Sequence, residues 1–386
     1  MGLTIAVGAA GAGHAVVGFD VNDGLVAQLN SGKSHIEGIR DSDLAGFITS
    51  GSYAASSDPN VLDVCEVIVI AVPTPLDTNR NPDLTYVHAA SDLISQSVKN
   101  PALIINESTS YPGTLRKEIA ARITGVDHLY ASSPERVDPG NTAWGTKNTP
   151  RLIGGLTPSA VAKAVQFYGS FCDNIIEVSS PEVAEAAKIF ENTFRQVNIA
   201  LVNEFAQIAD ALGISGREVL DAAATKPYGF MPFNPGPGVG GHCIPVDPSY
   251  LAHVANEVGV PATFIKRANE VNLAMPAYVV KRVVMGSGGS VRGKKVVVVG
   301  VSYKSNVADT RETPAAAVID LLREQGATVT WHDDLVATWR GESSSAIADA
   351  DIAVVVTKHD GVDLAAIKAC GYVFDCTGNL DGVDGI

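Results

Sequence analysis

The amino-acid sequence predicts an α/β protein with two doubly wound parallel sheets joined by a long central helix, and with the first strand of the N-terminal sheet missing. Short apolar β-rich segments alternate with helical segments in both halves of the chain, and this alternation builds a parallel sheet with helices on both faces. One amphipathic pattern covers residues 181–212 between the halves. The chain has 386 residues, which is too many for one core, so we expect two or three packed units.

The first α/β unit is predicted at residues 1–178. Its strands are expected at short apolar runs, each bounded by polar or turn residues. These strands are 15–19, 67–72, 103–106, 128–133 and, at the end of the unit, 175–178. The helices between them are expected at 23–31, 83–98 and 112–123.

The central region, residues 179–285, begins with the long helix. Between residues 181 and 212 apolar side chains recur every three or four positions, Pro181 stands in the first turn and Gly213 follows the last. We expect this helix to bridge two domains and to offer a surface for a homodimer or larger homo-oligomer. A Pro/Gly-rich loop at 230–248 and further helix to about residue 285 complete the region.

The C-terminal unit, residues 286–386, is predicted to be a second, smaller α/β domain. A basic Gly-rich linker at 286–295 leads into it, and KKVVVVGVSYK (294–304) forms a strand followed by a loop. Its remaining elements are a helix at 314–325 and strands at 327–332, 352–357 and 372–376.

Composition narrows the class of protein. The net charge of −14 repels phosphate backbones, so we expect no nucleic-acid partner. No apolar run approaches a membrane span and the N-terminus lacks the pattern of a signal peptide, so we expect no membrane association. The five cysteines show no paired spacing, which predicts reduced thiols in the cytoplasm and no metal site.

The N-terminal unit carries part of a dinucleotide site. Such Rossmann-like sites begin with a strand, a G-x-G-x-x-G loop and a helix, and an acid about 20 residues further on holds the ribose diol of NAD. Asp20 ends the strand 15–19, and its spacing suits Gly2 as the third glycine of that loop. We therefore expect Gly2 and Asp20 to bind NAD rather than NADP.

The first strand and the first two glycines of this fingerprint are absent, because Met1-Gly2-Leu3 leads at once into a helix. Gly8, Gly11 and Gly13 do not replace them, since no strand precedes those residues. We expect that the natural protein starts upstream of Met1. N-terminal mass measurement would test this, and a natural start at Met1 would instead predict weak NAD binding.

Three further loops follow predicted strands, where open α/β sheets bind ligands. They are VPTP (72–75), ESTSYPGT (107–114) and SSPERVDPG (132–140). Their order at successive strand ends is specific, although each alone is a common turn. The cofactor residues predicted there are Val72, Pro73, Thr74, Ser108 and Thr109, and the substrate residues are Glu135, Arg136 and Val137.

The strongest single signal is the loop around Cys243. Gly236, Gly238, Gly240 and Gly241 would let the backbone approach a ligand closely, and HCIPVD (242–247) then places a thiol near the carboxylate of Asp247. Isolated cysteines are more often buried and inert. A cysteine in a Gly/Pro-rich loop with a nearby acid is unlike such a core residue, so we predict a reactive thiol.

These motifs together resemble the UDP-glucose/GDP-mannose dehydrogenase family, and most closely its UDP-N-acetylglucosamine 6-dehydrogenases. Beside the loops at 107–114 and 132–140, the stretches that carry the resemblance are VPTPLDTNRNPDLTYV (72–87), AEAAKIFENTFRQVNIALVNEFAQI (184–208), TKPYGFMPFNPGPGVGGHCIPVDPSYL (225–251) and GVSYKSNVADTRETPA (300–315). The resemblance implies NAD-dependent oxidation of a sugar CH2OH to a carboxylate. Cys243 would hold the intermediate aldehyde and pass through a thioester.

The resemblance also implies the other catalytic roles. Lys188 and Asn192 lie four residues apart, hence on one helix face, and would hold the developing oxyanion. Asp247, acting with Lys188, would handle the alcohol proton through a water. Glu135 would be the base for thioester hydrolysis, and Thr109 would order the water.

Further contacts follow from the same resemblance. Lys304 would reach the sugar nucleotide, Arg311 would reach NAD, and the C-terminal domain would bind UDP. Arg195, one turn beyond Asn192, is a further predicted substrate contact. The remaining predicted substrate residues are Pro235, Gly236 and Gly240.

The sugar and the integrity of the site stay open. UDP-N-acetylglucosamine is the first expectation, and UDP-N-acetylmannosamine or UDP-glucose is the alternative with the same chemistry. A truncated, non-catalytic protein that binds UDP-sugar or assembles with partners is the alternative of another class. A hydroxyacid dehydrogenase with one hydride step is a third reading, which would not require Cys243.

Overall fold

The computed structural model describes residues 2–36, 38–138, 140–141, 143–241 and 243–386. The chain divides into two compact units, Met1–Glu191 and Asn192–Ile386. Their boundary falls inside the long helix α6 (Pro181–Leu212), which has the bounds that its sequence pattern predicts. The predicted division at residues 178 and 285 stays a prediction. Met1, on which the expected upstream start depends, lies outside the described residues.

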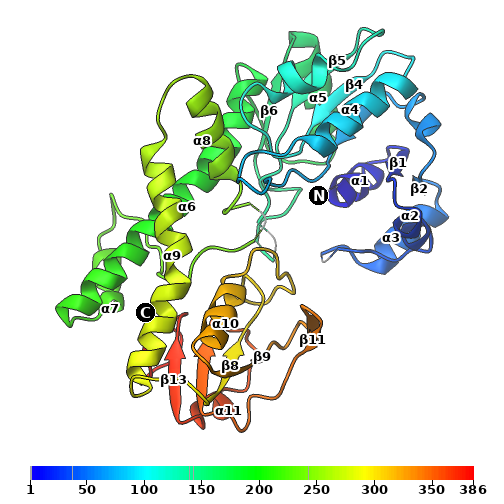
Figure 1. Ribbon diagram of the computed structural model, residues 1–386. Helices are drawn as coiled ribbons and strands as arrows, with labels where there is room; N and C mark the ends of the chain where they lie inside the picture. The colour runs from blue at the N-terminus through cyan, green and yellow to red at the C-terminus, as the bar shows by residue number, and fades with distance from the viewer. Residues whose placement is uncertain (1, 37, 139, 142, 242) are drawn as a thin grey trace. The chain divides into compact units, whose positions relative to one another are not determined.

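The first unit contains a mixed sheet in the order β3-β4-β5-β6-β7 (Figure 1). Its strands are β3 (Val67–Ile70), β4 (Leu103–Asn106), β5 (Leu129–Ser132), β6 (Arg151–Gly155) and β7 (Ile175–Glu177). All neighbours are parallel except β5 and β6, which are antiparallel. The expectation of a purely parallel sheet is therefore wrong at β6, a strand that the sequence reading did not predict.

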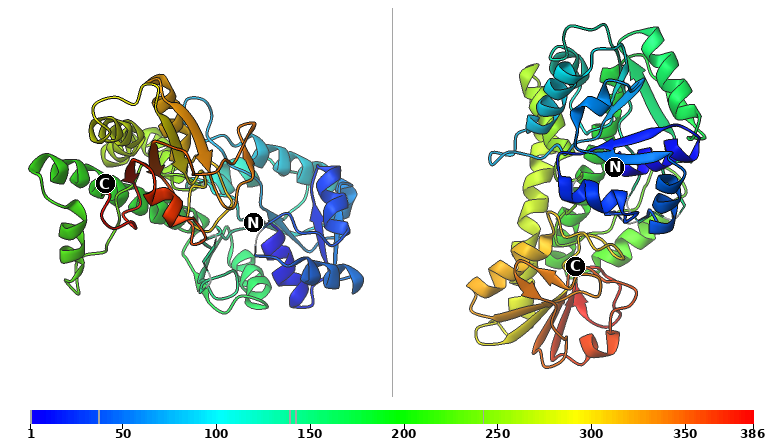
Figure 2. Two further views of the ribbon diagram at one scale, coloured as in Figure 1. Left: turned by 90° about the horizontal axis from the view of Figure 1, so that it is seen from below. Right: turned by 90° about the vertical axis from the view of Figure 1, so that its right-hand side faces the viewer.

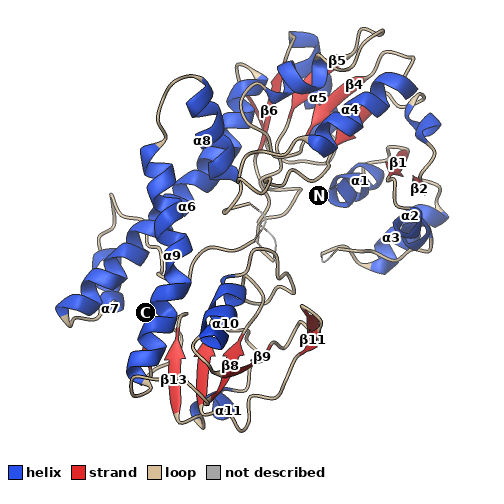
Figure 3. Cartoon of the chain, in the orientation of Figure 1, coloured by secondary structure: helices blue, strands red, loops and turns tan. Residues whose placement is uncertain are grey.

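A separate small sheet pairs β1 (Val16–Phe19) with β2 (Tyr53–Ser56) in parallel (Figure 3). In the doubly wound order the first strand would lie between β1 and β3. The sheet is thus divided at the place where the sequence predicts a missing strand. Helix α1 (Gly2–Gly11) contributes to both parts, since Ile5 packs on the larger sheet while Leu3 and Ala10 pack with β2.

Helices cover the sheets of this unit as the alternation predicts. The segment at 112–123 is a short π-helical turn, η2 (Leu115–Ala120), rather than the expected α-helix. The other helices are α2 (Asp23–Asn30), α3 (Asp41–Thr49), the 3₁₀ turn η1 (Pro59–Leu62), α4 (Thr85–Ser97) and α5 (Pro158–Gly169).

The second unit has a sheet in the order β14-β13-β12-β8-β9, with parallel neighbours throughout. Helices α9 and α10 pack on one face, and α11 packs on the other (Figure 2). The bounds are β8 (Lys295–Val299), β9 (Thr328–His332), β12 (Ile352–Val355), β13 (Tyr372–Asp375), β14 (Asp384–Gly385), α7 (Gly216–Ala224), α8 (Asp247–Glu257), α9 (Thr263–Gly286), α10 (Pro314–Glu324) and α11 (Leu364–Lys368). A small hairpin joins β10 (Thr338–Trp339) and β11 (Glu342–Ser343).

The predicted fold class is confirmed. Both units are α/β, and the long helix α6 contributes residues to each of them. Over the described ranges, no helix is both long and apolar enough to cross a membrane.

Candidate active site

Cys243 lies in a turn directly before helix α8 and is only partly buried. Its carbonyl oxygen accepts the backbone N–H groups of Val246 (3.1 Å) and Asp247 (2.8 Å), which fixes the turn. The structure therefore gives Cys243 the exposure that a nucleophile needs. The other cysteines are also free thiols.

Asp247, the first residue of α8, is fully buried. The amide nitrogen Nδ2 of Asn192 donates a hydrogen bond of 2.6 Å to its Oδ2. Lys188, one helical turn before Asn192 on α6, is 9% exposed. Two of the predicted catalytic residues are thus in direct contact within the second unit.

The glycines of the Cys243 loop serve contacts inside the protein. A side chain at Gly240 would place its Cβ 2.8 Å from Tyr303 Cβ and 2.9 Å from the Glu312 carbonyl oxygen. Gly241 has a φ of +86° and faces the Tyr303 ring. Gly236 donates its N–H to Asn203 Oδ1 at 2.8 Å. Gly240 and Gly241 thus have packing roles, and the substrate contacts predicted for Gly236, Gly240 and the half-buried Pro235 stay predictions.

Gly240→Ala should displace the Cys243 loop, because the new Cβ would overlap atoms of the neighbouring loops rather than a flexible side-chain end. We expect kcat to fall by about 10²-fold, the size of effect that a shift of about 1 Å produces at a reacting centre. Gly169→Ala is the matched control, since that glycine is exposed and no atom lies near its added Cβ. Steady-state kinetics of both variants test this, and equal rates would contradict it.

Lys304 and Arg311 lie in one loop, between β8 and α10, which packs against the Cys243 loop in the same unit. Gly241 N–H donates to the Arg311 carbonyl oxygen (2.9 Å), and Tyr303 N–H donates to that of Asp309 (2.8 Å). The Arg311 side chain is exposed and pairs with Asp309 at 2.5 Å. Two stretches that are distant in sequence, the Cys243 loop and the loop between β8 and α10, are thus in contact. Arg195 lies exposed on α6.

Asp333, which the sequence reading missed, anchors the loop that carries Lys304. Its Oδ2 accepts the N–H groups of Val301 (2.8 Å) and Ser302 (3.0 Å) and lies 3.1 Å from Nε2 of His359. Burial would raise the pKa of Asp333, but these hydrogen bonds outweigh burial and hold the pKa below its usual value. Nothing in the sequence distinguishes Asp333 from other acidic residues that follow a predicted β-strand, so its role was not predicted.

The predicted cofactor residues other than Arg311 belong to the first unit. Ser108 Oγ exchanges hydrogen bonds with the backbone of Val72, accepting its N–H and donating to its carbonyl oxygen, both at 2.9 Å. Thr74 and Thr109 are buried, and Pro73 is exposed. The ends of β3 and β4 are therefore held together by hydrogen bonds.

Gly2 and Asp20, which are predicted to bind a dinucleotide, both lie in the first unit. A Cβ on Gly2 would lie 3.5 Å from Ala71 Cβ, so the start of α1 lies against the end of β3. Asp20 follows β1 and accepts the N–H of Asn22 at 2.9 Å. The positive end of α1 and the acid at a strand end fit the pyrophosphate and ribose of NAD.

Glu135 is held by its own loop. Its Oε1 accepts the N–H groups of Arg136 (2.7 Å) and Val137 (2.9 Å), and its Oε2 lies 3.3 Å from Nη2 of Arg151. The Arg136 guanidinium pairs with Glu191 at 2.6 Å, so this side chain is already engaged. The sequence reading missed Arg151.

Glu185 on α6 ties the ESTSYPGT loop to the long helix. Its carboxylate accepts the N–H groups of Gly113 (2.7 Å) and Leu115 (2.9 Å). Burial raises the pKa of Glu185 to about 7, although these two hydrogen bonds oppose the shift. Lys188 lies one turn after Glu185 on α6. The hydrogen bonds of Glu185 therefore also fix the loop that contains Thr109 relative to the turn of α6 that carries Lys188.

The free energy of unfolding should fall as the pH rises from about 4.5 to about 7, because the folded protein keeps a proton on Glu185 that the unfolded chain releases near pH 4.5. A pKa change of this size corresponds to about 3 kcal/mol. Glu185→Gln should lack this part of the dependence, whereas Glu177→Gln, at an exposed residue on β7, should keep it. Urea unfolding at about pH 5 and about pH 8 measures the difference. The same pH dependence in both variants would contradict the assignment.

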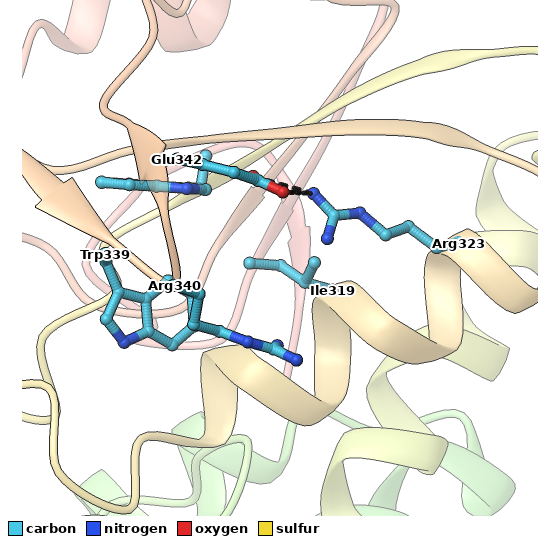
Figure 4. A pocket seen from close by; sticks show the side chains of 6 residues that line it. Ile319, Arg323, Trp339, Arg340 and Glu342 are labelled. Carbon is cyan, nitrogen blue, oxygen red and sulfur yellow. Dashed lines mark hydrogen bonds and ion pairs between the residues drawn. The ribbon is translucent and has the colours of Figure 1, made fainter.

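A pocket of about 130 Å³ lies beside α10 in the second unit (Figure 4). Arg323 pairs with Glu342 at 2.9 Å and Arg340 pairs with Asp320 at 3.0 Å. Since each guanidinium already faces a carboxylate, we do not assign this pocket to a nucleotide phosphate. Among the described residues, no group of three or more His, Cys, Asp or Glu side chains is placed to hold a metal ion.

Comparison with known proteins finds three family models along the chain. They describe the NAD binding domain, the central domain and the UDP binding domain of the UDP-glucose/GDP-mannose dehydrogenase family. The matches cover residues 1–172, 182–274 and 297–381.

Individual relatives agree with these matches. A UDP-N-acetyl-D-mannosamine dehydrogenase of Methanococcus maripaludis is 37% identical over 93% of this chain and 84% of its own. A UDP-N-acetyl-D-glucosamine 6-dehydrogenase of Pseudomonas aeruginosa is 36% identical over 84% of this chain and 77% of its own. The solved UDP-D-ManNAc dehydrogenase of Pyrococcus horikoshii has a TM-score of 0.90 and 31% identity, covering 100% of this chain and 96% of that chain.

Proposed function

This chain belongs to the UDP-glucose/GDP-mannose dehydrogenase family of NAD-dependent enzymes, and we propose that it oxidises the C6 CH2OH of UDP-N-acetylglucosamine to a carboxylate through a thioester on Cys243. The observation that carries the proposal is the partly exposed Cys243 in the turn before α8. Four residues later Asp247 begins this helix and accepts a hydrogen bond from Asn192 of α6. A hydroxyacid dehydrogenase would leave this constellation unexplained.

Converting an alcohol to an acid removes four electrons, so the reaction needs two hydride transfers. NAD, when bound, accepts one hydride in each of them. Between the two, an aldehyde would diffuse away unless the protein held it. The Cys243 thiolate adds to that aldehyde, and loss of the second hydride from the resulting carbon leaves a thioester.

Lys188 and Asn192 stabilise the negative oxygen that forms when sulfur adds to the aldehyde. Their spacing of four places both on one face of α6. Both side chains donate hydrogen bonds, and donors fixed in place cost no reorganisation during reaction. The buried Asp247 carboxylate orients the Asn192 amide and takes up the alcohol proton through a water.

Glu135 takes a proton from the water that hydrolyses the thioester, and Thr109 orders that water. The carboxylate is accessible enough for this role, with 12% of its side-chain surface exposed. Release of the uronate then returns the thiolate.

UDP-N-acetylmannosamine is the second candidate substrate, because relatives named for it match as well as those named for the glucosamine sugar. A panel of UDP-N-acetylglucosamine, UDP-N-acetylmannosamine and UDP-glucose with NADH detection tests the assignment. We expect the first to have kcat/KM at least about 10-fold above the others, with two NADH per sugar. Absence of NADH with every sugar would refute the proposed activity and favour the non-catalytic alternative.

We also propose a homodimer through α6. Large apolar side chains along this helix are exposed in the single chain, and such a surface marks an interface. They are Val183, Phe190, Phe194, Leu201, Ile208 and Leu212. Light scattering after size-exclusion chromatography tests this, and a monomer would contradict it.

A further inference from the structure

A buried arginine connects two acidic side chains behind the loop of Glu135. Arg151, the first residue of β6, is 4% exposed. Its Nη1 lies 2.6 Å from Oε1 of Glu107, and its Nη2 lies 3.3 Å from Oε2 of Glu135. The two carboxylates come from segments that follow β4 and β5, so one guanidinium joins three strand ends of the first unit.

Arg151 is fixed from behind by further contacts. Tyr168 on α5 donates its hydroxyl proton to Glu107 Oε1 at 2.5 Å, and its ring centroid lies 4.5 Å from the guanidinium carbon. Arg151 Nη1 also donates to the Ser133 hydroxyl at 3.2 Å. All of these partners are fully buried. The guanidinium therefore has a single available orientation.

The charges of the network favour this arrangement. Burial raises the pKa of Glu107 to about 7, with Arg151 opposing the shift. Burial would lower the pKa of Arg151, but the attraction of Glu107 and Tyr168 outweighs it and the pKa lies above its usual value. Arg151 is thus charged at neutral pH, and its guanidinium attracts the carboxylates of both Glu107 and Glu135.

The hydrogen bonds leave one oxygen atom of the Glu135 carboxylate able to accept a further hydrogen bond or a proton. Two backbone N–H groups occupy the two lone-pair sites of Oε1. Oε2 accepts only from Arg151 within the described part of the chain, so one site on Oε2 stays available to a water. The position of that site depends on where Arg151 holds the carboxylate.

We infer that Arg151 is a positioning residue that aims Oε2 of Glu135 at the hydrolytic water, and that Glu107 and Tyr168 hold Arg151 for this purpose. The inference rests on the proposed thioester chemistry. In that step the water oxygen bonds to the acyl carbon, the carbon–sulfur bond breaks, sulfur leaves as the thiolate and the water proton passes to Oε2. No electrons are transferred.

Arg151→Lys tests the inference, because an ammonium keeps the charge but does not reproduce the fork that reaches both carboxylates. With NAD and the UDP-sugar, we expect formation of two NADH per site in the first turnover at a rate within about threefold of the wild type. Hydrolysis should be about 10- to 100-fold slower, so the acylated Cys243 peptide accumulates in quenched samples. Rapid-quench mass spectrometry measures the adduct.

Two further variants keep the test decisive. Tyr168→Phe removes the proton donor to Glu107 but keeps the ring, and should slow hydrolysis in the same way by a smaller factor. Arg122→Lys alters an exposed arginine that pairs with Asp92 at 3.3 Å and should change neither step. Thermal melting of each variant separates unfolding from misplacement, and Tyr168→Phe decides the matter if Arg151→Lys does not fold.

Glu135→Gln separates failure of the inference from failure of the proposed function. If Glu135→Gln accumulates thioester while Arg151→Lys hydrolyses it at the wild-type rate, the positioning role is overturned and the base assignment stands. If Glu135→Gln hydrolyses thioester normally, the base assignment fails and the inference fails with it. Equal slowing of hydride transfer and hydrolysis by Arg151→Lys would indicate a structural role only, which also overturns the inference.

Discussion

Cys243→Ser should abolish acid formation, with kcat for the acid lowered by more than about 10³-fold. A serine hydroxyl remains protonated at neutral pH and adds poorly to the aldehyde, so no acyl intermediate forms. The reaction then stops at or before the aldehyde, with at most one NADH per sugar. Single-turnover NADH absorbance together with chromatography of the sugar products measures both quantities.

Cys370→Ser is the matched control for this variant. Cys370 is also a partly buried free thiol of the second unit, and its sulfur contacts the Ala366 carbonyl oxygen at 3.6 Å. We expect its acid formation to stay within about twofold of the wild type, as for substitutions away from the reacting groups. Undiminished acid production by Cys243→Ser would remove the thioester from the mechanism.

Asn192→Leu should lower kcat by about 10²–10³-fold, the usual result of removing one donor to a developing oxyanion. Leucine has nearly the same shape as asparagine but donates no hydrogen bond. The buried Asp247 carboxylate also loses the 2.6 Å bond from Asn192, which should reduce the free energy of unfolding by about 1–3 kcal/mol. The KM for the UDP-sugar should change little if the donor acts mainly on the transition state.

Asn198→Leu on the same helix is the control for position and shape. Its Nδ2 donates to the Phe194 carbonyl oxygen at 2.7 Å, within the helix itself. We expect kcat of Asn198→Leu to equal that of the wild type. A larger loss in KM than in kcat for Asn192→Leu would show that this residue binds the substrate instead of stabilising the oxyanion.

Long periodic patterns were enough to predict much of the fold. The helix over residues 181–212 has the predicted bounds because its apolar side chains keep a helical period and Pro181 marks its start. Strand β6 escaped prediction because it begins with a charged residue and ends with Gly154 and Gly155, which lower strand propensity. The structure explains Gly154, since a Cβ there would overlap the Ser180 carbonyl oxygen.

The candidate site was predictable where the residue types of a sequence motif themselves indicate the reaction, as in the Cys243 loop. The residues that support those motifs were not. Arg151, Glu185 and Asp333 give no local signal, because each acts on a loop distant in sequence. Their roles depend on burial and on backbone N–H groups that only the folded chain brings within reach.

The most direct test of the proposed mechanism is the mass of the Cys243 peptide from enzyme quenched during turnover with NAD and UDP-N-acetylglucosamine, in the wild type and in Glu135→Gln. The mechanism predicts an acyl adduct on that peptide that hydroxylamine removes, and a higher fraction of adduct in Glu135→Gln. Acid production without any adduct on Cys243, in both proteins, would contradict it.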